Sequence, residues 1–98
     1  MKHLVHTVAL AALLALPALS AQAGCYADYK AKRDNPLKLH YGVVQLPDNA
    51  CASTQVAAGN IAQRLAADGW VLLNVLSIFD DNGLPQRRES AGEYYLRY

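Results

Sequence analysis

The longest apolar stretch beyond the N-terminal region covers residues 69–79, Gly-Trp-Val-Leu-Leu-Asn-Val-Leu-Ser-Ile-Phe. It is rich in β-branched and aromatic residues and is followed by an Asp-Asp-Asn-Gly turn, which is typical of a strand. Both alternating sets of positions are apolar, with Val71 and Leu73 in one set and Trp70 and Leu72 in the other. Because such a strand needs cover on both faces, we expect two layers around it.

Two more elements come before this strand. Residues 37–46 alternate apolar and polar side chains in their first half, which predicts a half-exposed strand. Residues 50–68 have small and aliphatic side chains at spacings of three and four, which predicts an amphipathic helix ended by Gly69. Three residues are candidates for its N-cap: Asp48, Asn49 and Ser53.

The remaining segments complete a small α+β fold. Residues 24–36 are polar and predict an N-terminal arm, and residues 80–86 have the composition of a turn. Residues 93–98 predict a closing aromatic strand. We therefore expect a β-α-β-β domain over residues 37–98, with a three- to four-stranded, mainly antiparallel sheet. One helix should pack on one face of that sheet, the face that holds Leu39, Tyr41 and Val43.

Residues 1–23 predict a signal peptide. Lys2 provides the basic start, residues 4–16 the apolar region, and Ala21-Gln22-Ala23 the small-residue pattern at which signal peptidase cuts. The mature chain should begin at Gly24 and be periplasmic or secreted. No later segment is apolar enough to suggest a membrane span after cleavage.

The two cysteines, Cys25 and Cys51, both fall in the exported part. In an oxidising compartment, such a pair in a small domain predicts a disulfide. The alternative is a lipid-anchored envelope protein lipidated at Cys25, although Gln22 stands where a lipoprotein signal has an aliphatic residue. Two thiols and one mature histidine make no recognisable metal site, so we expect neither a metal nor a cofactor.

Charge adds little at the level of sequence. Without Lys2, the chain has eight basic and eight acidic side chains, so the mature protein is neutral. This balance gives no indication of nucleic-acid binding.

The chain resembles a family of small uncharacterised bacterial domains. The resemblance covers about residues 38–98 and is carried by Leu-Ala-Ala-Asp-Gly-Trp at 65–70, the Val-Leu-Leu-Asn-Val strand and the closing aromatic strand. It implies a small α+β fold with a Gly-Trp-x-Leu strand, here in an exported form, and it implies no activity.

Candidate chemistry is sparse. His40 is the only histidine of the mature chain, and no serine lies in a Gly-x-Ser-x-Gly context. We therefore expect a non-catalytic module that binds an unknown protein or small ligand, or forms a weak homodimer, through a sheet face. A small enzyme using His40 and Glu93 is the weaker hypothesis. The sequence places four residues on the candidate binding face: His40, Glu93, Tyr95 and Arg97.

Overall fold

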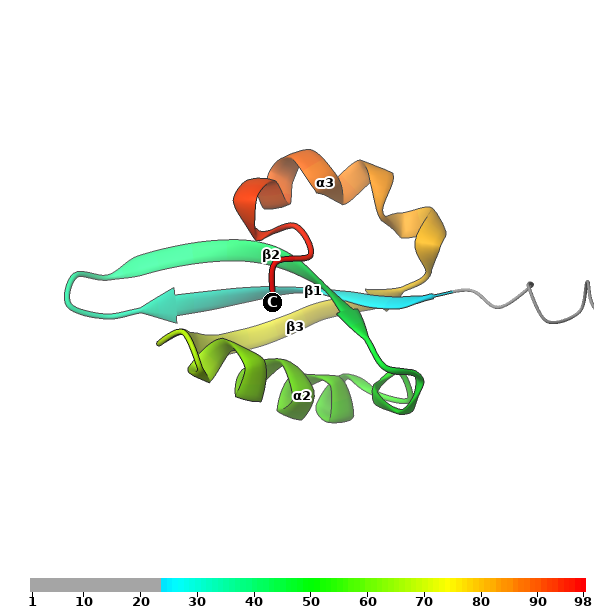
Figure 1. The fold of residues 1–98 in the computed structure, drawn as a ribbon, viewed down its shortest axis with the longest axis horizontal. Helices are drawn as coiled ribbons and strands as arrows, with labels where there is room; N and C mark the ends of the chain where they lie inside the picture. Colours follow the sequence, from blue (N-terminus) through cyan, green and yellow to red (C-terminus); the bar gives the residue numbers. More distant parts are fainter. Residues whose placement is uncertain (1–23) are drawn as a thin grey trace, which may run out of the picture.

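The computed structural model describes residues 24–98, which form a small α+β domain with a three-stranded antiparallel sheet (Figure 1). The expected fold class is confirmed, whereas the signal peptide predicted over residues 1–23 lies outside the described residues. The elements are β1 (Cys25–Arg33), β2 (Lys38–Leu46), α2 (Thr54–Ala66), β3 (Val71–Phe79) and α3 (Pro85–Ala91). Short 3₁₀ turns occupy Asp48–Ala50, Asp81–Gly83 and Gly92–Tyr94.

The central strand is β1, in the order β2-β1-β3, and both of its neighbours run antiparallel to it. The interpretation of residues 24–36 as an arm overlooked this strand. Its alternate residues Ala27, Tyr29 and Ala31 are fully buried in the core. Between them lies Asp28, whose carboxylate is paired with a cation. The high content of polar residues concealed an alternating strand pattern.

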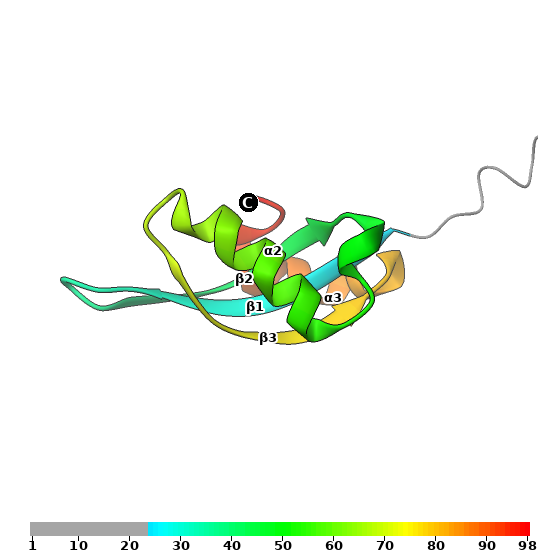
Figure 2. The ribbon, with the colours of Figure 1, turned by 90° about the horizontal axis from the view of Figure 1, so that it is seen from below.

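Helix α2 packs on one face of the sheet (Figure 2) and buries Ala57, Ile61 and Leu65 there. Ser53 is its N-cap and accepts a hydrogen bond from the amide of Val56. Gly69 ends it with a φ of 81°, and the amide of Trp70 bonds to the carbonyl of Leu65. The expected helix and its terminating glycine are therefore confirmed.

The strand face beneath α2 differs from the expected one. Val44 and Leu46 of β2 belong to the core there, so the face with Leu39, Tyr41 and Val43 points away from α2. His40 and Gly42, which made the α2 face seem polar in the sequence, are both buried. The prediction chose the wrong face because His40 and Gly42 are not apolar. In the structure His40 is hydrogen-bonded inside the core, and Gly42 makes room for the Tyr29 ring.

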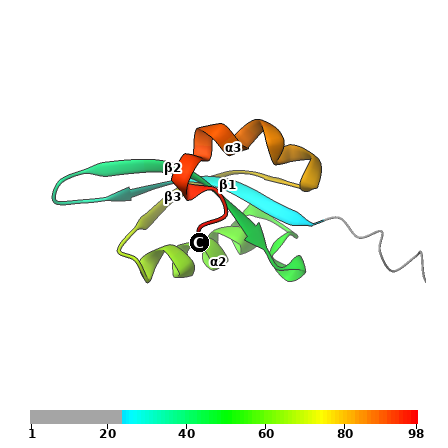
Figure 3. The ribbon, with the colours of Figure 1, turned by 45° about the horizontal axis from the view of Figure 1, so that its top comes forward.

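The opposite face of the sheet is covered in part by α3 (Figures 1 and 3). The order of elements is thus β-β-α-β-α, and the expected closing strand is absent from the described residues. Residues 85–91 form a helix that begins at Pro85, a favourable first-turn residue. The C-terminal tail, residues 95–98, touches the outer edge of β2 through one parallel bridge between Val43 and Tyr95. The two expected layers are present, and β3 lies at an edge of the sheet.

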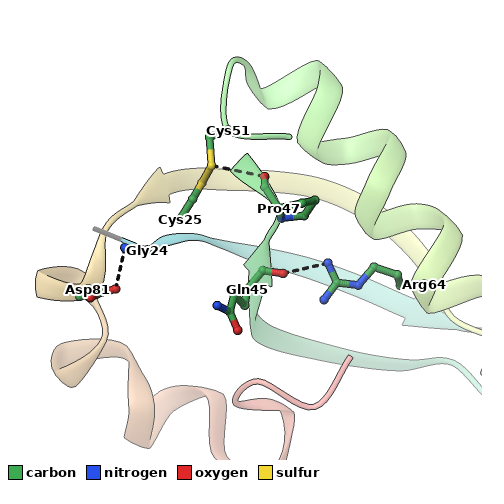
Figure 4. Close-up of a disulfide and its surroundings, with 7 residues drawn as sticks. All are labelled: Gly24, Cys25, Gln45, Pro47, Cys51, Arg64 and Asp81. Carbon is green, nitrogen blue, oxygen red and sulfur yellow. Dashed lines mark hydrogen bonds between the residues drawn. A yellow bond between two sulfur atoms is a disulfide. The ribbon is translucent and has the colours of Figure 1, made fainter. Parts of the chain in front are cut away.

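The predicted disulfide joins Cys25 to Cys51, whose Cα atoms are 6.2 Å apart (Figure 4). It ties the start of the central strand to the segment that leads into α2. Nearby, the amide of Gly24 donates to the carboxylate of Asp81, 3.2 Å away. Helices long and apolar enough to cross a bilayer are absent over residues 24–98.

Candidate functional site

Helix α3 leaves open the part of its sheet face that lies next to the β1–β2 turn (Figure 3). The three strands present exposed side chains there, and the register aligns Lys32 with Leu39 on one side and with Val71 on the other. Leu39 is 65% exposed, Val71 53% and Leu73 49%. We name this surface the hairpin face and define it by five residues: Lys30, Lys32, Leu39, Val71 and Leu73.

A shallow pocket of about 240 Å³ lies within the hairpin face. It is lined by six residues, of which Ala31 and His40 are themselves buried: Lys30, Ala31, Leu39, His40, Tyr41 and Leu73. Two irregularities in the β1–β3 pairing each insert one extra residue into β3, and one of the inserted residues is Leu73 of this pocket. The Tyr41 hydroxyl is a neutral donor, because burial and a hydrogen bond to Asp28 raise its pKa to about 12.

The covered half of this sheet face is organised around Asp28. Its carboxylate accepts hydrogen bonds from Tyr41 at 2.9 Å, from Ser77 at 2.6 Å and from Nε of Arg87 at 2.9 Å. Burial opposes ionisation of Asp28, but these donors outweigh it and hold the carboxyl pKa below its usual value. Arg87 also lies over the Phe79 ring, 4.0 Å from its centroid. Because Arg87 belongs to α3, these contacts fix the position of α3 on the sheet and thereby determine which part of the sheet face it covers.

His40 lies on the opposite face, inside an aromatic cluster. Its Nε2 shares a 2.8 Å hydrogen bond with the Tyr29 hydroxyl, and its ring stacks on Tyr94 with centroids 3.7 Å apart. The ring meets Trp70 edge-on at 4.3 Å. Nδ1 is buried and has no hydrogen-bond partner within the described part of the chain. Desolvation, with the nearby Arg33 and Arg97, lowers the pKa of His40.

This enclosure bears on the enzyme hypothesis, since a general base must reach the proton that it removes from a substrate. His40 is only 8% exposed. Glu93 is paired instead with Arg97, 3.2 Å away. The geometry therefore suits a packing role for His40 better than a catalytic one.

The structure brings three of the four sequence-predicted site residues to one edge. Arg97 lies 5.7 Å from the ring centroid of Tyr94, which covers His40, and Arg97 also pairs with Glu93. Tyr95 lies apart from them, with the Arg88 guanidinium 5.5 Å from its ring centroid. Sequence reasoning missed the hairpin face, because a helix was expected over Leu39.

A larger hollow of about 520 Å³ lies between α2 and the tail. Its cation, Arg64, donates to the carbonyls of Gln45 and Tyr98 and to the side chain of Asn60. Through these hydrogen bonds the guanidinium holds the C-terminal tail against α2. We therefore regard this hollow as structural.

Clusters of three or more possible metal-binding side chains are absent from the described residues 24–98. Comparisons with protein-family models, curated proteins and solved structures find no match to this chain. The resemblance to small bacterial domains stays a prediction.

Proposed function

We propose that this protein is an exported, non-catalytic module of the bacterial envelope that binds a protein or small ligand through the hairpin face. The observation that carries the proposal is the exposure of Leu39, Val71 and Leu73 beside Lys30 and Lys32. An apolar patch with a polar rim is typical of an interaction site.

Export is supported by two independent features. Residues 1–23 have the order of a signal peptide, and the Cys25–Cys51 disulfide suits an oxidising compartment. A periplasmic or secreted protein fits both. A lipid anchor at Cys25 would need the sulfur that the disulfide uses. The intact mass of the exported protein distinguishes the two, since a disulfide-bonded chain carries no added lipid.

A photo-cross-linking side chain placed at Leu39 tests the proposed binding surface in living cells. The matched control is the same side chain at Val56, an exposed apolar position of α2 that is 49% exposed. We expect a specific adduct, to protein or to a smaller molecule, at position 39 and none at position 56. Equal adducts at both positions, or none at position 39, would remove the proposal.

A further inference from the structure

The neutral charge balance of the mature chain hides a strong segregation. Residues 30–38, which form the end of the β1–β2 hairpin, have four cations and one acidic residue, Asp34. The rest of residues 24–98 has four cations and seven acidic residues. The hairpin end is therefore a positively charged pole of the molecule. Its cations are Lys30, Lys32, Arg33 and Lys38.

Two of these cations already have partners. Lys32 pairs with Asp34 at 3.3 Å, and Arg33 lies 3.8 Å from the Asp68 carboxylate. Lys30 and Lys38 form no ion pair within residues 24–98. Positive charge therefore remains available at the hairpin end, and Lys30 lies on the wall of the pocket that Leu39 and Leu73 line.

The hairpin end also has the two most exposed large apolar side chains of the described residues, Leu37 at 64% and Leu39 at 65%. The β1–β2 turn projects beyond both helices (Figure 1). A projecting end with aliphatic side chains and lysines suits a broad, flat and negatively charged surface better than it suits a narrow groove. Aliphatic groups enter the boundary between lipid headgroups and acyl chains, and lysines remain at the phosphates.

We propose that the ligand of the hairpin face is anionic phospholipid presented at the surface of a bilayer, an inference that rests on the proposed binding function of this face. Leu39, with Leu37 of the adjoining turn, contacts the headgroup–acyl boundary, and Lys30, the lysine of this face that has no ion-pair partner, contacts lipid phosphates. Asp68 is paired with Arg33, and Asp81 lies at the opposite end of the sheet beside Gly24, so the charge distribution also orients the protein.

A second copy of this chain is a poorer occupant of the same face. Two hairpin faces placed against each other would bring Lys30 and Lys32 of one copy close to the same lysines of the other. Like charges in a desolvated contact oppose association. An anionic bilayer provides the opposite charge for every lysine.

The test uses protein recovered after export, with loss of the leader confirmed by intact mass. Its binding is measured by co-sedimentation with vesicles of phosphatidylcholine alone and with mixed vesicles of phosphatidylcholine and phosphatidylglycerol. Lys30→Gln removes one cation from the hairpin face, and Arg88→Gln is the matched change at an exposed position outside it. Leu39→Ser and Val56→Ser form the corresponding apolar pair. Circular dichroism verifies that each variant is folded.

We expect binding to the mixed vesicles that weakens with salt, and little binding to neutral vesicles. Lys30→Gln should weaken binding about fivefold, the factor expected for one cation near an anionic surface. Leu39→Ser should weaken binding as well, whereas both controls should leave it unchanged.

Absence of binding to mixed vesicles, equal binding to neutral ones, or equal losses in the controls would overturn the inference. A position-39 adduct to a protein without vesicle binding would refute membrane docking and leave the proposed function intact. Concentration-dependent dimers blocked by Leu39→Ser, again without vesicle binding, would identify a second copy as the occupant and equally refute it. If neither a position-39 adduct nor vesicle binding is observed, both the proposed function and membrane docking are refuted.

Discussion

At the scale of single residues, the interior depends on one close approach between backbone and ring. Tyr29 crosses from β1 over Gly42 of β2, and a Cβ at Gly42 would overlap the Tyr29 ring. This approach lets the Tyr29 hydroxyl reach His40. Gly42 is therefore needed for space, since its φ is not in the left-handed region.

Gly42→Ala should destabilise the protein by about 1–3 kcal/mol, because an overpacked core must shift its rings or its backbone. Gly59 is the matched control, because a Cβ there would meet no atom within 4 Å. Gly59→Ala lies inside α2 and should stabilise by about 0.5–1 kcal/mol. Urea denaturation of the two variants measures both changes, and equal effects would show that Tyr29 does not cross Gly42.

His40 gives the fold a dependence on pH. Its pKa is lowered in the folded protein, so folding favours the neutral ring. This contribution to stability is complete above the unfolded pKa of 6.5 and is lost as pH falls through the lower folded value. We expect the free energy of unfolding to fall as pH decreases below 6.5. Asp28 contributes only at lower pH, because the pKa of its carboxyl is 3.8 in the unfolded chain and lower still in the folded protein.

His40→Phe keeps a ring against Tyr94 but cannot titrate. Its unfolding free energy, measured by denaturation across the same pH series, should therefore show a flatter profile below pH 6.5 than the unmodified protein. Parallel profiles for the two proteins would mean that His40 does not cause the pH dependence.

At the scale of elements, local patterns predicted the strand at 37–46, the strand at 69–79 and the helix with its glycine terminus. These elements are periodic over many residues, so their type follows from the sequence. The central strand was missed because its outer face is stabilised by a contact with Arg87, which lies 59 residues from Asp28. The helix at 85–91 was missed for the same reason, since it is held by that distant partner.

The candidate site, like the central strand, could not be predicted from local sequence patterns. Leu39 was recognised as an apolar position, but its exposure depends on which face α2 chooses, and that choice depends on His40 and Gly42 being buried. The sequence pattern of a single strand contains neither fact. Charge segregation likewise became visible only once residues 30–38 were known to form one projecting end.

Arg87→Met should destabilise the protein by about 3–5 kcal/mol, because it leaves the Asp28 carboxylate buried without its cation. Arg88→Met, at the neighbouring exposed position, should stay within about 0.5 kcal/mol. Guanidinium denaturation measures both. Similar values for the two variants would show that the ion pair does not anchor α3.

The double variant Asp28→Asn with Arg87→Met should recover part of that loss, since no charge is then left buried. No recovery would assign the loss to the packing of the Arg87 side chain on Phe79, whose ring centroid lies 4.0 Å from the guanidinium carbon.

At the scale of the whole molecule, two helical layers enclose one part of the sheet, and the hairpin end extends beyond them (Figure 1). The disulfide closes the opposite end, where β1 begins. The molecule therefore has a covalently fixed end and an open, positively charged end. The proposed binding function depends on this arrangement, and the arrangement depends on β1 being the central strand.

Amide hydrogen exchange of the protein, resolved by residue with NMR, tests this claim most directly. Both edges of β1 are hydrogen-bonded, so its amides over residues 27–31 should exchange among the slowest in the chain, through global unfolding. The amides of Asp34, Asn35 and Leu37 in the exposed turn should exchange fast. Fast exchange over residues 27–31, as in a polar arm, would contradict the account.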